Sequence, residues 1–126
     1  MTGVQTCALP IFTLYATDSK YRKYKVIARY QQYEGANMIV DRVRAGYPKK
    51  GLIWHFQGSG KSYLMEFAAV KLRMLPDLMN PTVLIVDDRL DLESQITAQF
   101  HSSDVGNLES ASTREQLMTK IGRAHV

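Results

Sequence analysis

Apolar side chains recur every three or four residues between Tyr30 and Ala45, which predicts an amphipathic helix with Tyr33, Ala36, Val40 and Val43 on its inward face. Gly46 is the expected stop of this helix. Good helix formers fill residues 62–75 and Pro76 ends them, so a second helix is expected whose inner face carries Leu64, Phe67, Ala68, Leu72 and Leu75. A third helix is predicted at residues 91–100, and the capping-box pattern from Ser112 to Glu115 predicts the start of a fourth.

Two short apolar runs have a different pattern. Residues 51–56 (GLIWHF) and 82–86 (TVLIV) are rich in strand-forming residues and are bounded by turn-forming ones. Continuous apolar runs are typical of strands that a parallel sheet buries on both faces. With the helix between them, they predict a strand, helix, strand unit and an α/β fold with a parallel sheet and flanking helices.

The composition is that of one ordinary globular domain. The chain has 126 residues, of which 45% are hydrophobic and 22% charged, and a net charge of +4. The single cysteine, Cys7, cannot form an internal disulfide, and zinc-ligand spacing is absent from the sequence. A secretory signal and a long apolar run are also missing, so a cytoplasmic location without membrane contact is expected.

The two ends have an unusual relation. TCALPI (Thr6–Ile11) can be encoded by ACGTGTGCTCTTCCGATC, and the reverse complement of that sequence, read from its second base, encodes IGRAHV (Ile121–Val126). Both peptides resemble a translated sequencing-library adapter. We therefore expect residues 1–11 and 121–126 to be non-native tails, and residues 12–120 to be the natural part.

The segment from Lys20 to Arg29 (KYRKYKVIAR) interleaves basic residues with tyrosines. Such a segment can bind phosphates and stack on bases. Charge runs are more often a solvated surface, here the approach to the first helix, and this simpler interpretation is favoured.

Gly58, Ser59, Gly60, Lys61 and Ser62 form the sequence GSGKS between the first predicted strand and the second predicted helix. This is the context that a phosphate-binding loop requires. Two glycines allow backbone N–H groups to curl around an anion, and the helix start adds its positive dipole end. The Lys61 side chain can reach the outer phosphates and the Ser62 hydroxyl can bind Mg²⁺. The full motif has glycine where this chain has His55.

Three stretches carry a family resemblance: RYQQYEGANMIVDRV, KKGLIWHFQGSGKSYLMEFAAVKLR and NPTVLIVDDRLDLESQI, with a weaker likeness at FTLY. The chain resembles the restriction (R) subunit of type I restriction-modification enzymes, a DNA-translocating motor of the superfamily-two helicase type. In that family the loop is similar to HTQGSGKS, so His55 is expected there and Phe56 is a minor departure. The resemblance implies part of a RecA-like phosphate-loop NTPase lobe, the N-terminal part of the ATP-binding lobe.

The resemblance also implies residue roles. Lys61 is the catalytic residue, Gly58 to Ser62 bind ATP, and Ser62 binds Mg²⁺. Arg29 and Gln32, with Gln31 as the competing choice, match a pattern that contacts the adenine ring; a solvent-facing glutamine is the alternative. Arg89 and Gln95 match a motif that follows the DNA backbone.

The implied parent is an ATP-dependent type I site-specific deoxyribonuclease that acts on double-stranded DNA with modification and specificity subunits. ATP hydrolysis also needs an acidic residue and an arginine that lie downstream in the family, and no residues before residue 120 match them. The chain alone is therefore expected to bind ATP with Mg²⁺ weakly and not to hydrolyse it. Asp87 and Asp88, after an apolar run, keep a small kinase-like phosphate-loop enzyme open as an alternative, and the basic segment keeps a non-catalytic DNA-binding module open.

Overall fold

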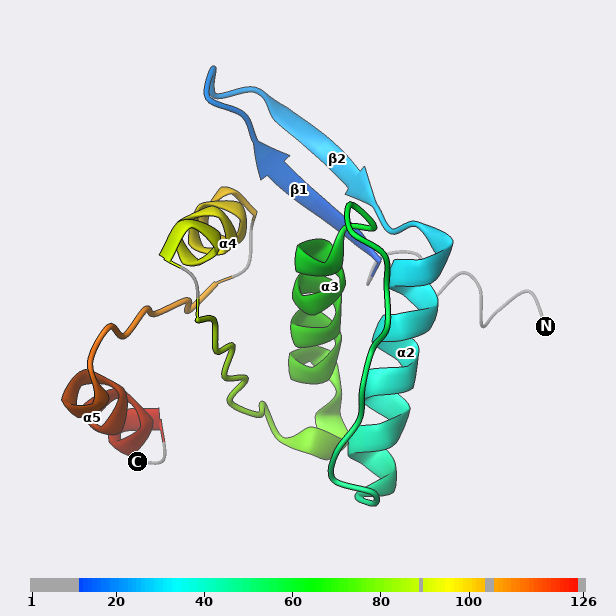
Figure 1. Cartoon of the computed structure of the whole chain (residues 1–126), viewed down its shortest axis with the longest axis vertical. Helices are drawn as coiled ribbons and strands as arrows, with labels where there is room; N and C mark the ends of the chain where they lie inside the picture. The colour runs from blue at the N-terminus through cyan, green and yellow to red at the C-terminus, as the bar shows by residue number, and fades with distance from the viewer. Residues whose placement is uncertain (1–11, 89, 104–105, 125–126) are drawn as a thin grey trace.

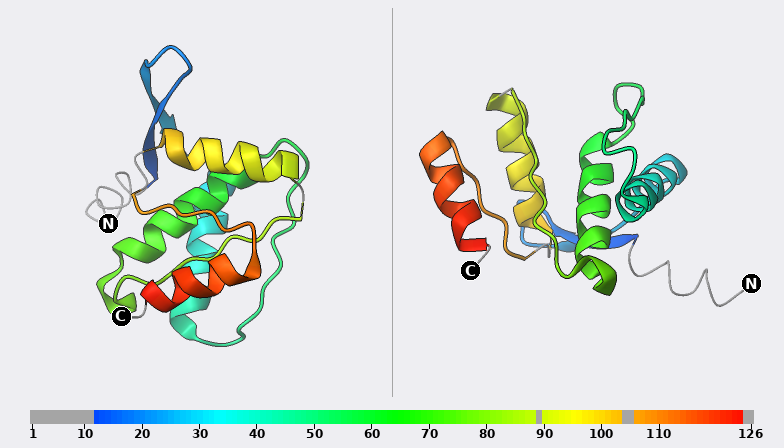
Figure 2. Two further views of the ribbon diagram at one scale, coloured as in Figure 1. Left: turned by 90° about the vertical axis from the view of Figure 1, so that its left-hand side faces the viewer. Right: turned by 90° about the horizontal axis from the view of Figure 1, so that it is seen from below.

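The computed structural model describes residues 12–88, 90–103 and 106–124. A two-stranded hairpin crosses a group of helices, and three of these, α2, α3 and α4, lie beside it (Figures 1 and 2). No helix in the described residues has both the length and the apolar character needed to cross a membrane. The tail predicted at residues 1–11 lies outside the described part of the chain, whereas residues 121–124 continue the last helix.

The hairpin pairs β1 (Thr13–Thr17) with β2 (Lys23–Ile27) in antiparallel register. Leu14 and Ala16 are buried on its inner face while Tyr15 between them is exposed, which is the period of two that a half-buried strand requires. The favoured interpretation of the basic segment as the approach to a helix is therefore wrong in part, because residues 23–27 form a strand.

The predicted helices are present. They are α2 (Tyr30–Ala45), α3 (Lys61–Met74), α4 (Leu90–Ser102) and α5 (Arg114–Ala124), with a short 3₁₀ helix η1 (Pro76–Leu78) after α3. Gly46 ends α2 in the left-handed region, at φ 72°, and its N–H bonds to the carbonyl groups of Arg42 and Val43. The predicted stop is thus confirmed.

The start of α5 differs by one residue from the prediction. The cap is the Thr113 hydroxyl and not that of Ser112, because Thr113 Oγ1 accepts the Gln116 N–H at 3.2 Å. The Gln116 side chain in turn accepts the Ser112 N–H at 3.1 Å. Thr113 is therefore the cap in place of the predicted Ser112, and the return bond comes from Gln116 in place of the predicted Glu115. That bond reaches the N–H of Ser112, one residue before the cap, so the start of α5 departs from the reciprocal pattern of a capping box.

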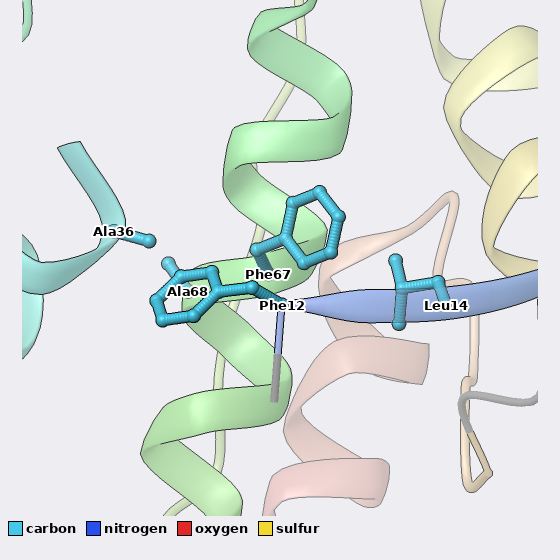
Figure 3. Close-up of a cluster of buried hydrophobic side chains, with 5 residues drawn as sticks. All are labelled: Phe12, Leu14, Ala36, Phe67 and Ala68. Carbon is cyan, nitrogen blue, oxygen red and sulfur yellow. The ribbon is translucent and has the colours of Figure 1, made fainter. Parts of the chain in front are cut away.

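The core lies where β1 meets α2 and α3. Phe12 sits between the two helices and packs with Leu14, Ala36, Phe67 and Ala68 (Figure 3). The rings of Phe12 and Phe67 have centroids 6.0 Å apart. Two residues expected inward, Tyr33 and Val43, are instead more than two-fifths exposed. Tyr33 still packs against Phe12, with ring centroids 4.6 Å apart and the ring planes tilted by 57°.

Helix α4 packs against the other end of β1. Ile96 and Phe100 are buried, and Ser103 forms a bridge with Ala16. The Gln99 side chain of α4 donates a 2.8 Å hydrogen bond to the buried carboxyl group of Glu66 in α3. A polar contact therefore ties α3 to α4 inside the apolar layer.

The two predicted parallel strands do not form in the described chain. Residues 51–56 and 82–86 are extended segments outside any ladder, and the described sheet has only two antiparallel strands. They lie on opposite sides of α3 (Figures 1 and 2). Trp54 is 87% exposed and Val86 is 82% exposed. The predicted parallel sheet is therefore wrong for the described chain. A central parallel strand needs neighbouring strands, and the described residues provide none to either segment.

Candidate functional site

The GSGKS segment forms a tight loop at the start of α3. Gly58 and Gly60 have φ values of 82° and 81°, in the left-handed region that glycine adopts without strain. The Ser59 N–H bonds to the Phe56 carbonyl at 3.3 Å, which closes the turn before the helix. The first N–H groups of α3 have no partner within the helix, as at the start of any α-helix, and the glycine loop directly precedes them. This is the arrangement that binds anions.

Gln32 holds this loop in place. The residue is 4% exposed, and its side chain donates a 3.1 Å hydrogen bond to the Gly60 carbonyl. Its amide oxygen accepts the Arg29 N–H at 2.8 Å, which caps the start of α2. A Cβ atom at Gly60 would lie 2.3 Å from Nε2 of Gln32, so a side chain there would displace the Gln32 amide, and the positive φ also favours glycine.

The close approach of α2 to α3 makes this contact possible. A Cβ atom on Gly35 would lie 2.5 Å from Cδ1 of Leu64, so the absent side chain lets the helices meet one turn beyond Gln32. Ala36, on the next position of α2, is fully buried. Small residues on α2 thus bring the Gln32 amide within reach of the loop.

An open hollow of about 440 Å³ lies beside the loop. The end of β2, the start of α2 and the loop line it, and Arg29, Gln32, Gly58 and Gly60 are among the lining residues. Its described lining contains two basic residues, Lys25 and Arg29, and no acidic one, which suits an anionic ligand. The volume is within the range of small-molecule sites.

Two tyrosines that the sequence did not indicate as site residues also line this hollow. Tyr24 lies on β2 and Tyr63 on the first turn of α3, and both line the hollow. Burial raises the pKa of Tyr63, and a hydrogen bond with Tyr24 raises it further. Tyr63 follows the motif directly, and this adjacency was the available signal. Tyr24 could be placed only once the strand was known.

The remaining predicted residues are distributed unequally. Lys61 is exposed and Ser62 half-buried in the first turn of α3, next to the loop. Gln31 is exposed, in contrast to Gln32. Gln95 is exposed on α4 and is not among the residues that line the hollow. Arg89 lies outside the described residues.

The loop fits a polyphosphate with Mg²⁺. The Ser59 hydroxyl is buried and has no hydrogen-bond partner among the described atoms, so the loop contains an unpaired polar group. The described residues contain no cluster of three His, Cys, Asp or Glu side chains that could hold a metal ion. One serine hydroxyl is compatible with Mg²⁺, which keeps several waters and takes oxygens from the phosphates.

The chain belongs to the SWI2/SNF2 ATPase family, whose model matches residues 31–126. It is similar to the Type I restriction enzyme HindI endonuclease subunit of Haemophilus influenzae, with 44% identity over 96 residues, 72% of this chain and 9% of that protein. It is also similar to the Putative type I restriction enzyme MjaVIIP endonuclease subunit of Methanocaldococcus jannaschii, with 47% identity over 75 residues, 56% of this chain and 7% of that protein.

These findings confirm the resemblance to type I restriction endonuclease subunits that the sequence indicated. The chain spans less than a tenth of the length of these two relatives. No solved structure shows significant similarity to it.

Proposed function

We propose that this chain is the ATP-binding part of the DNA-translocating motor in a type I restriction endonuclease subunit. The observation that carries the proposal is the glycine loop at the start of α3, held by the Gln32 side chain through the Gly60 carbonyl. Family membership supports ATP as the nucleotide, and the relatives' names support a restriction enzyme as the parent.

The residues of the loop divide the work of binding. The backbone N–H groups from Gly58 to Ser62 surround the phosphates, and the Lys61 ammonium neutralises the outer phosphates. The Ser62 hydroxyl would be a ligand of Mg²⁺, and this ion would neutralise charge on the phosphates. Lys61 is exposed at the helix start, so its ammonium can swing toward the ligand.

For the adenine ring the structure favours Gln32 over Gln31. Gln32 lines the hollow and is fixed at both ends of its amide, whereas Gln31 is exposed. Each end of the Gln32 amide makes one hydrogen bond, which leaves one N–H and one lone pair for an adenine edge. Arg29 lies at the same side of the hollow and adds a positive charge.

The same proposal accounts for the exposed apolar segments. Residues 51–56 and 82–86 become strands of a RecA-like parallel sheet where neighbouring strands are present, because their unpaired backbone and apolar side chains need that cover. Gln95, and Arg89 before α4, contact the backbone of double-stranded DNA in such a lobe. Modification and specificity subunits are the proposed partners of the parent.

The test is titration of the chain with a fluorescent ATP analogue and Mg²⁺. Binding is expected for the unchanged chain and is lost in Lys61→Ala, because the outer phosphates lose their cation. Lys49→Ala, at another exposed lysine, is the matched control and keeps the affinity. Equal affinity in all three proteins contradicts the assignment of the loop. Steady ATP turnover that Lys61→Ala abolishes contradicts the proposal of an inactive isolated chain and favours the kinase-like alternative.

A further inference from the structure

The net charge of the chain is concentrated in the hairpin segment. Residues 12–29 contain five basic residues and one acidic residue, so this segment alone carries +4, which equals the net charge of all 126 residues. The rest of the chain is therefore electrically balanced. Such an asymmetry favours an anionic partner at the hairpin.

The outer face of the hairpin alternates basic and aromatic side chains. Tyr15 lies directly opposite Lys25, and Thr17 lies opposite Lys23. Because side chains alternate across a strand and the neighbouring Leu14 and Ala16 are buried, these four residues share the opposite, solvent-facing side. The tip of the hairpin projects away from the helices (Figures 1 and 2).

The turn at the tip presents one more aromatic ring. Asp18 accepts the N–H groups of Lys20 and Arg22 at 2.8 and 2.9 Å and pairs with the Arg22 guanidinium at 2.9 Å. These bonds hold the pKa of Asp18 below its usual value, and the bond from the Arg22 N–H has the largest effect. The carboxylate therefore stays ionised and the turn stays closed at neutral pH. Within this turn Tyr21 has φ 59° and is 91% exposed.

A tyrosine in that position needs an explanation. The left-handed region is unfavourable for a bulky residue, and an exposed ring gains nothing from burial. Asparagine or glycine would form the same turn with less strain. The turn thus holds a large ring in solvent at a cost in backbone energy, between the basic residues Lys20 and Arg22.

We propose that the outer face and tip of this hairpin bind a single-stranded nucleic acid, with the ammonium groups of Lys20, Lys23 and Lys25 on the phosphates and the rings of Tyr15 and Tyr21 stacked on bases. Two observations favour a single strand over a duplex. The exposed rings need bases with free faces, and bases inside a duplex are stacked on one another. A ribbon with basic residues between aromatic rings matches the general pattern of strand-binding surfaces.

The test positions Lys20, Tyr21 and Lys23 are independent of nucleotide binding, because they are not among the residues that line the hollow beside the glycine loop. Lys25 lines that hollow as well as the outer face, so it is not used as a test position. The test uses fluorescence anisotropy of a labelled oligothymidylate with the full chain at several salt concentrations. Lys20→Gln/Lys23→Gln is expected to reduce the slope of log affinity against log salt by about 1.4. Tyr21→Asn is expected to weaken binding at least about fivefold and to leave the slope unchanged.

Matched controls exist for both variants. Lys49→Gln/Lys50→Gln removes two adjacent exposed lysines outside the hairpin. Met79→Asn changes another exposed residue, at φ 50° and 87% exposure, away from the hairpin. Asparagine tolerates positive φ, so neither Tyr21→Asn nor Met79→Asn should lower the melting temperature, which is checked by circular dichroism.

The outcomes separate the possibilities. Strand binding that the hairpin variants weaken and the control variants keep supports the proposal, and Lys61→Ala should keep it too. Equal losses in the controls, or no measurable binding, overturn it. A duplex probe bound as tightly as the single strand, with no effect of Tyr21→Asn, also overturns it, since phosphate attraction alone would then explain the binding.

Discussion

Replacing Gln32 by alanine removes two hydrogen bonds that join separate parts of the site. The first runs from Nε2 to the Gly60 carbonyl at 3.1 Å and the second from the Arg29 N–H to Oε1 at 2.8 Å. Gly60 belongs to the glycine loop and Arg29 to the start of α2. The substitution therefore loosens the loop and uncaps the helix at once.

The magnitude follows from what each backbone group does afterwards. The Gly60 carbonyl keeps a second partner, because it also accepts the Leu64 N–H at 3.1 Å. It is therefore not left unsatisfied, and the lost bond from Gln32 is expected to cost about 0.5–1.5 kcal/mol, the net value of one ordinary hydrogen bond. Arg29 is exposed and water can replace its lost partner, so about 1 kcal/mol is expected there, as for the loss of a helix cap. Together the free energy of unfolding should fall by about 1.5–2.5 kcal/mol.

Chemical denaturation of the variants measures this loss, and the neighbouring glutamine provides the control. Gln31→Ala, at an exposed position, should change stability by less than about 0.5 kcal/mol. Gln32→Glu keeps the acceptor for the Arg29 N–H, removes the donor to Gly60 and places a carboxylate oxygen against the Gly60 carbonyl, so it should loosen the loop at least as much as loss of the donor alone. Nucleotide affinity should fall in both Gln32 variants and not in Gln31→Ala. Equal effects of Gln31→Ala and Gln32→Ala would refute the reasoning.

Two further predictions concern α3. Burial raises the pKa of Glu66, although hydrogen bonds from Ser103 and Gln99 oppose the shift. Folding therefore favours the neutral carboxyl group. The stability that this group contributes is complete below its unfolded pKa of about 4.5 and is lost as the pH rises through its folded pKa. Glu66→Gln should therefore raise the melting temperature at pH 7 and not at pH 4, and a gain that is the same at both would contradict this. Gly60→Ala should abolish nucleotide binding in the titration, because it places a Cβ atom 2.3 Å from Nε2 of Gln32 and alanine at φ 81°. Gly106→Ala is the control and should keep binding, because the space around Gly106 is open.

The helices were predictable because their pattern is local. The three- and four-residue spacing of α2, its stop at Gly46 and the end of α3 before η1 depend only on neighbouring residues. The hairpin was missed because its inner face shows only the weak alternation of Leu14 and Ala16, and the run of basic residues in β2 concealed the period of two.

Strands depend on partners far along the chain, and this limited the prediction of the sheet. Residues 51–56 and 82–86 have the apolar character of central strands, yet pairing needs neighbours that the described residues do not supply. An apolar run therefore indicates where a strand can form and not whether it forms in this chain.

The glycine loop was predictable because its chemistry lies in five consecutive residues. The choice between Gln31 and Gln32 was not predictable from the sequence, since the two are neighbours in the same turn of α2 and the one that contacts Gly60 depends on how α2 packs against α3. Tyr24 required knowledge of the hairpin register.

The central claim is that the backbone amides from Gly58 to Ser62 surround a polyphosphate. Two-dimensional NMR of the ¹⁵N-labelled chain tests this claim most directly, with and without ATP and Mg²⁺. The account predicts that the largest amide shift changes lie within Gly58 to Ser62 and shrink strongly in Lys61→Ala. Shift changes that spare these five amides while ATP is bound elsewhere would contradict it.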